Sequence, residues 1–121
     1  KGIKEAQASL VNIGVSKYEE KKYEKSFSSF RAAIESHDLL KANGQKSLLD
    51  EPGQLEDQLY ITGLAALLAN RCNDAMIFFN KLYKAGTDKP EVYEGLYNCK
   101  LQLGDETGAG KMLEEGRKKF P

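Results

Sequence analysis

Short polar breaks divide the chain into six segments in which apolar residues recur at helical spacing. Ala, Leu, Glu, Lys and Gln dominate these segments, while β-branched residues are scarce. That composition favours helix over strand. We therefore predict an all-α fold with about six helices, spanning roughly residues 4–20, 23–42, 51–70, 73–85, 90–103 and 106–119. Because the links between them are short, successive helices should pair as antiparallel hairpins.

Comparison of the chain with itself reveals a repeat. A shift of 34 residues aligns apolar with apolar and alanine with alanine, in the pairs Leu59/Tyr93, Leu67/Leu101, Ala75/Ala109 and Phe79/Leu113. A shift of 49 residues relates the first hairpin to the second, in the pairs Leu10/Leu59, Gly14/Gly63, Tyr18/Leu67, Ser26/Ala75 and Phe30/Phe79. The difference of 15 residues (49 − 34) predicts an insertion after the first hairpin, at about 41–55. A fixed period of this length is typical of helical-repeat proteins.

The repeated unit resembles the tetratricopeptide repeat (TPR) family in its order of large apolar, small, aromatic and turn residues. In the first copy these positions are Leu10, Ile13, Gly14, Tyr18, Tyr23, Ser26, Phe30 and Ala33. The third copy departs from the pattern, with Tyr97 at the small position and Gly116 at an alanine position. The resemblance implies one domain, residues 1–121, in which antiparallel hairpins stack as a right-handed α-solenoid. Its repeats would span about 7–40, 56–89 and 90–121.

The glycine-rich stretch 103–112, "LGDETGAGKM", raises the question of a phosphate-binding loop. A P-loop reads GxxxxGK[ST], and its glycines and hydroxyl hold the phosphates and magnesium. Here Asp105 stands at the first glycine position and Met112 at the hydroxyl position. Both required residues are absent, so we interpret Gly104 and Asp105 as the turn of the third hairpin and exclude a nucleotide site.

No other pattern indicates catalysis, a metal or a cofactor. His37 is the only histidine; near the end of a helix, we expect it to be partly exposed beside the negative end of the helix dipole. Cys72 and Cys99 form neither a CxxC pair nor part of a histidine cluster, so we expect two lone thiols rather than a zinc site. Paired carboxylates such as Glu114 and Glu115 suit a solvated helix face. We therefore expect no enzyme, no catalytic residue, no metal site and no cofactor.

Charge and hydropathy narrow the range of partners. Acidic and basic residues balance at 18 each, so the positive field that nucleic-acid binding requires is missing. The longest apolar run, residues 63–69, is much shorter than the roughly 20 residues of a membrane span, which indicates a soluble domain without membrane insertion. Because the chain opens at Lys1 without a methionine, we expect a piece trimmed from a longer protein. Its compartment stays open, with the cytoplasm as the default and the bacterial periplasm as an alternative.

Binding of a protein or peptide is the function that remains. In the TPR family the first helix of each hairpin lines a concave surface, and this resemblance implies a peptide-binding groove. Its residues would be Val11, Val15, Tyr18, Lys22, Asp57, Tyr60, Ile61, Leu64, Leu67, Arg71, Glu94, Asn98 and Leu101. The apolar centre favours an apolar helix or an extended peptide, with Lys22 and Arg71 at one rim and acidic residues at the other.

The resemblance also argues against one class of partner. Family members that hold the acidic C-terminal tails of chaperones use a clamp of lysine, asparagine and arginine, because a carboxylate needs charge-assisted donors. The corresponding positions here are Val11, Val15, Ile61, Glu91 and Gly95. We therefore expect no clamp for chaperone tails.

Other interpretations stay open. Leu48, Leu49 and Leu55 of the insertion need apolar surroundings and could cover the groove, or the groove could join copies of the chain in a homo-oligomer. A function of another class is a carbohydrate or small-ligand carrier of a bacterial envelope, for which Tyr60, Tyr18 and Asn98 would provide aromatic and amide contacts. The chain could also be a fragment of a longer repeat protein whose groove is covered by its own segments.

Overall fold

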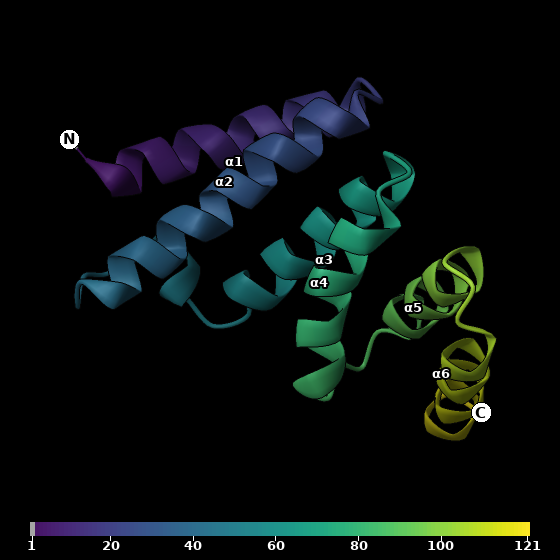
Figure 1. Ribbon diagram of the computed structural model, residues 1–121. Coiled ribbons are helices and arrows are strands. Elements are labelled where there is room, and N and C mark those ends of the chain that lie inside the picture. Colours follow the sequence, from purple (N-terminus) through teal and green to yellow (C-terminus); the bar gives the residue numbers. More distant parts are fainter. Residues whose placement is uncertain (1) are drawn as a thin grey trace.

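The computed structural model describes residues 2–121, which contain helices and no strand (Figure 1). The elements are α1 (Ile3–Glu19), α2 (Tyr23–Ala42), the 3-10 turn η1 (Leu48–Asp50), α3 (Gln54–Leu68), α4 (Cys72–Lys84), α5 (Pro90–Gln102) and α6 (Glu106–Lys119). The predicted all-α fold is confirmed. The largest boundary difference is at α3, which starts at Gln54 rather than residue 51 because Gly53 takes a left-handed conformation (φ 82°) in front of it.

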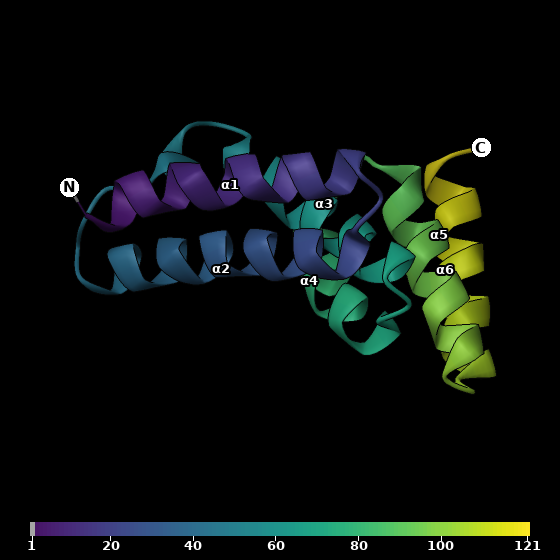
Figure 2. The same ribbon diagram turned by 90° about the horizontal axis from the view of Figure 1, so that it is seen from above.

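The helices pair as three antiparallel hairpins that stack in chain order. α1 packs on α2, α3 on α4 and α5 on α6, while α2 contacts α3 and α4 contacts α5 across the hairpin boundaries. The first hairpin therefore lies at one end of the stack and the third at the other, and the two termini are far apart (Figures 1 and 2). This arrangement is that of a helical-repeat solenoid.

The turn inside each hairpin repeats with the sequence. Each turn places one residue in the left-handed region: Lys21 (φ 61°), Asn70 (φ 60°) and Gly104 (φ 86°). Their separations are 49 and 34 residues, the same offsets that relate the apolar positions. Since this conformation is strained for residues with a side chain, its recurrence shows that the backbone follows the sequence period.

Glycine and phenylalanine are in close contact inside each of the first two hairpins. A Cβ added at Gly63 would lie 2.6 Å from Phe79 Cε1, and one added at Gly14 would overlap the ring of Phe30. A Cβ at Gly95, on α5, would lie 2.6 Å from Phe79 Cε2. Phe79 is therefore held between two glycines, one from its own hairpin and one from the next. Only glycine lets the helices approach this closely.

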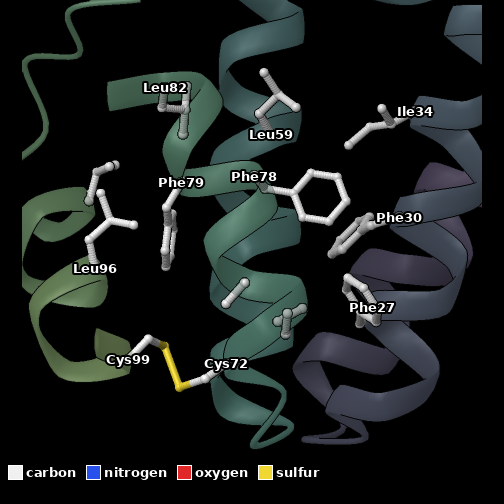
Figure 3. Close-up of a cluster of buried hydrophobic side chains, with 14 of the residues drawn as sticks. Phe27, Phe30, Ile34, Leu59, Cys72, Phe78, Phe79, Leu82, Leu96 and Cys99 are labelled. Atoms are coloured by element: carbon white, nitrogen blue, oxygen red, sulfur yellow. A yellow bond between two sulfur atoms is a disulfide. The ribbon is translucent and has the colours of Figure 1, made fainter. Parts of the chain in front are cut away.

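The core continues from hairpin to hairpin as one layer of side chains. Figure 3 shows Phe27 and Phe30 of α2 facing Phe78 of α4, with Phe79 on the other side of α4 facing Leu96 of α5. The rings of Phe27 and Phe78 meet edge to face with centroids 6.0 Å apart. All five side chains are buried. The hydrophobic contacts of α4 with both neighbours thus hold the stack together.

The extra residues after the first hairpin do two things. α2 has 20 residues against 13 in α4, so part of the insertion lengthens α2. The rest forms a connector, residues 43–53, that contains η1. Ser47 caps η1, because its Oγ accepts the Leu49 N–H at 3.1 Å while Asp50 accepts the Ser47 N–H at 2.8 Å. Gln7 of α1, which is fully buried, donates from Nε2 to Ser47 Oγ at 2.9 Å and ties the connector to the first hairpin.

His37 corrects a prediction. It was expected to be partly exposed at a helix end, but it is buried, with Nδ1 2.8 Å from Ser47 Oγ. The prediction was wrong because the connector folds back over the end of α2 and brings Ser47 against the imidazole. His37 therefore anchors the connector, together with Gln7.

The cysteines correct another prediction. Cys72, the first residue of α4, and Cys99, in the third turn of α5, form a disulfide with their Cα atoms 5.2 Å apart (Figure 3). The expectation of two lone thiols was wrong, because spacing along the chain does not reveal which residues meet between hairpins. The bridge joins the second hairpin to the third.

Candidate interaction surfaces

The predicted groove residues lie on the first helices of the hairpins and in the turns that follow them. Tyr60 of α3 shows how closely these helices approach one another. Burial raises the pKa of its phenol, and the neighbouring Glu91 and Tyr18 act in the same direction, as does Glu94. Residues of α1 and α5 therefore lie near this tyrosine of α3. This surface, formed by α1, α3 and α5, is called the groove below.

The apolar residues of the groove are partly rather than fully buried. Tyr18, Tyr60, Ile61, Leu64 and Leu67 each pack one side against the core and leave the other side accessible. Val11 is also half-buried, and Val15 is 45% exposed. Such an apolar strip on two helices, α1 and α3, is the kind of surface at which proteins bind one another.

The charges around Tyr60 favour a cation at the third-hairpin side of the groove. Lys89 Nζ lies 4.9 Å from the centre of the Tyr60 ring, in the position of a cation–π contact. Glu91 and Glu94, both exposed, lie near the same ring. Lys89 is thus the cation that this ring holds within the chain, and the two carboxylates lie beside it.

Arg71, assigned by the sequence to the other rim, makes its contacts within the chain. Its Nε donates to Asp74 at 2.7 Å, and its guanidinium forms an ion pair with Glu24 of α2 and lies 5.1 Å from the centre of the Phe27 ring. The hydrogen bonds to Asp74 and Glu24 raise the pKa of Arg71. Arg71 thus links the first two hairpins. Lys22, at the equivalent turn, pairs with Glu20 at 3.1 Å.

The remaining predicted residues are exposed. Asp57 of α3 and Glu94, Asn98 and Leu101 of α5 all face solvent, and Leu101 is 43% exposed. The two carboxylates among them, Asp57 and Glu94, form no ion pair within residues 2–121.

The connector borders one end of the groove. A shallow cavity of about 280 Å³ lies between it, α1 and α3, and Val11 shares this cavity with Leu48 and Leu49. Leu49 is buried, whereas Leu48 is half-buried. The sequence indicated that these leucines need apolar surroundings, and the structure provides them beside Val11.

One concave surface was not predicted from the sequence. It is a cavity of about 460 Å³ between α5 and α6, on the side of the third hairpin that faces away from α4, and is called the terminal slot below. Its lining residues are Pro90, Tyr93, Glu94, Tyr97, Asn98, Met112, Leu113, Gly116, Arg117 and Phe120. The departures of Tyr97 and Gly116 from the repeat pattern were the available signal, because both line this slot.

Neither surface carries a metal-binding cluster. Residues 2–121 bring together no group of three or more histidine, cysteine, aspartate or glutamate side chains that could hold an ion. Over the same residues, no helix combines the length and hydrophobicity needed to span a membrane.

Comparison with solved structures identifies the fold. The crystal structure of the TPR domain of Arabidopsis FLU is similar to this chain with a TM-score of 0.69 and 18% sequence identity, over 98% of this chain and 97% of that one. No protein-family model matches the sequence, and no curated protein matches it. A likeness at this identity shows the fold alone. The chain therefore has the fold of a TPR domain, as its repeated pattern of small and large residues predicted.

Proposed function

We propose that the chain is a non-enzymatic scaffold that binds an apolar helix or extended peptide in the groove of α1, α3 and α5. TPR domains are in general modules for protein interaction. The observation that carries the proposal is the half-buried strip of Val11, Val15, Tyr18 and Tyr60 with its neighbours on α3. A partner that covered the strip would remove its remaining apolar area from water.

The charges next to the strip indicate the chemistry of the partner. Arg71 is engaged by Glu24 and Asp74, while Glu91 and Glu94 remain exposed near Tyr60. The groove therefore favours a peptide with an apolar face and a basic flank. Because exposed charges are screened by salt, binding should weaken as the ionic strength rises.

One valine and one isoleucine on α1 provide a matched test. Val15 and Ile13 are 45% and 47% exposed, but two positions along a helix point to nearly opposite sides. A displayed library of amphipathic helical peptides would first be selected on the wild-type chain. We expect Val15→Glu to raise the Kd of the selected peptides about tenfold or more, and Ile13→Glu to leave it unchanged.

Both variants should keep the circular dichroism spectrum of the wild type, because both positions are accessible to solvent. Equal loss in the two variants, or no loss in Val15→Glu, would contradict binding in the groove. A glycan array tests the carbohydrate-carrier alternative: a glycan that binds the wild type and loses affinity in Val15→Glu would assign the groove to that ligand instead.

A further inference from the structure

The terminal slot is the repeat equivalent of a site that is filled elsewhere in the chain. Residues 34 positions before Tyr97 and Leu113 are Gly63 and Phe79. α5 covers Phe79 through Gly95, so the ring is fully buried. Leu113 has no such cover among residues 2–121 and is 38% exposed. The interface that joins successive hairpins is thus present on the third hairpin without a helix packed on it.

The slot is apolar with one charge on each side. Tyr93, Tyr97, Met112 and other apolar groups form its floor and walls, and its two charged lining residues are Glu94 on α5 and Arg117 on α6. Both are exposed, and neither forms an ion pair within residues 2–121. An occupant that matches this surface needs a basic group opposite Glu94 and an acidic group opposite Arg117.

The same surface on a second copy meets that requirement. α5 and α6 run antiparallel, and a Cβ on Gly116 would lie 3.4 Å from Tyr93 Cβ, so Glu94 and Arg117 lie at the same level along the hairpin. A two-fold axis parallel to the helices, between two facing hairpins, would place α5 of each copy over α6 of the other. Glu94 of each copy would then face Arg117 of the other, so the same ion pair would form twice. This self-complementarity is typical of an isologous interface.

We propose that the chain forms a symmetric homodimer through its terminal slots. In this dimer every adjacent helix pair, within and between copies, is antiparallel, as in an antiparallel four-helix bundle. Tyr97 of one copy lies at the level of Leu113 of the other and covers this leucine. Within each copy, α5 covers Phe79 in the same way. The slot opens on the side of the third hairpin that faces away from α4, and it shares Glu94 and Asn98 with the predicted groove. The interface involves one hairpin face, so we expect a weak dimer, with a Kd on the order of 10 μM.

Charge exchange tests the pairing directly. Sedimentation equilibrium of the full chain should show a reversible monomer–dimer equilibrium for the wild type. Glu94→Arg and Arg117→Glu each place like charges opposite one another on both sides of the two-fold axis, and each should raise the Kd at least tenfold. An equimolar mixture of the two variants restores opposite charges in a mixed dimer, and its Kd should return to within about threefold of the wild-type value.

Lys118→Glu is the matched control for Arg117→Glu. It changes the net charge equally, but Lys118 is not part of the slot and pairs with Glu114 on the exposed side of α6. Its Kd should equal that of the wild type. A wild type that stays monomeric at every concentration, a mixture that does not dimerise, or a Lys118→Glu variant as weak as Arg117→Glu would each overturn the proposal.

Discussion

The second and third hairpins share a sequence register but differ in how much of them is buried. On α4 the buried residues are Cys72, Ala75, Phe78, Phe79 and Leu82, whereas on α6 they are Ala109 and Met112. Within residues 2–121, the second hairpin is packed between two neighbours, and the third has a neighbour on one side only. The same repeat position is therefore buried in the second hairpin, as Phe79, and partly exposed in the third, as Leu113. Its burial depends on whether a neighbouring helix packs on it, and not on the residue alone.

The difference in burial predicts a difference in local stability. Besides the contacts between α4 and α5, the third hairpin is held by the Tyr83 hydroxyl, which donates to Glu115 of α6 at 2.8 Å, and by Lys119, which donates to the Gly86 carbonyl at 3.1 Å. These polar links lie near the surface and add little stability each. We expect α6 to open more readily than α4 in hydrogen exchange.

The largest effect should come from removing the ring at the centre of the second hairpin. Phe79→Ala would leave a cavity between Gly63 and Gly95 and should lower the free energy of unfolding by about 3–5 kcal/mol. The equivalent change in the third hairpin, Leu113→Ala, removes a side chain that is already 38% exposed and should cost about 1 kcal/mol or less. Urea denaturation of both variants, at protein concentrations too low for association, measures the difference. Equal losses would mean that the third hairpin is covered as well as the second.

The disulfide links the second and third hairpins covalently, in addition to the backbone between α4 and α5. Cys72 and Cys99 are 27 residues apart. Closing a loop of this length lowers the conformational entropy of the unfolded chain and so stabilises the folded state by about 2–4 kcal/mol. Reduction should lower the free energy of unfolding by that amount and increase hydrogen exchange more in α5 and α6 than in α1 and α2. The double variant Cys72→Ala, Cys99→Ala should be insensitive to reductant.

If the oxidised and reduced wild type unfold at the same urea concentration, the bridge contributes nothing to stability. Thiol titration of the purified, unreduced protein provides the companion measurement, and no free thiol is expected. Disulfides persist in oxidising compartments and are rare in the cytosol, so an intact bridge in cells would favour the periplasmic alternative over the cytoplasmic default.

The fold was predictable because residues that pack together recur at fixed offsets in the sequence. The pairs Gly14/Phe30 and Gly63/Phe79 recur at a fixed offset, and each pair is a contact in the structure. Where a residue lies outside that regularity, prediction failed. The burial of His37 depends on an irregular connector, and the disulfide depends on which residues of two hairpins come together.

The surfaces were predictable only in part. The helices that carry the groove follow from the repeat, but the direction of Arg71 depends on Glu24, a residue 47 positions away that no local pattern connects to it. The terminal slot exists because no helix within residues 2–121 packs on the side of α5 and α6 that faces away from α4. The sequence pattern alone cannot show such an uncovered face. The second and third hairpins share the same repeat pattern, although a further hairpin covers only one of them within residues 2–121.

The smallest expected effect comes from replacing a glycine by alanine, because the second and third hairpins differ in the space around their glycines. At Gly63 an added methyl would lie 2.6 Å from the Phe79 ring, so Gly63→Ala should destabilise by about 1–3 kcal/mol although alanine is the better helix former. At Gly110 of α6 nothing lies within 4 Å, so Gly110→Ala should stabilise by about 0.5–1 kcal/mol. Thermal and urea denaturation should therefore shift in opposite directions for one chemical change. A stabilising Gly63→Ala would show that the Phe79 ring can move aside, and the close contact that defines the second hairpin would lose its role in stability.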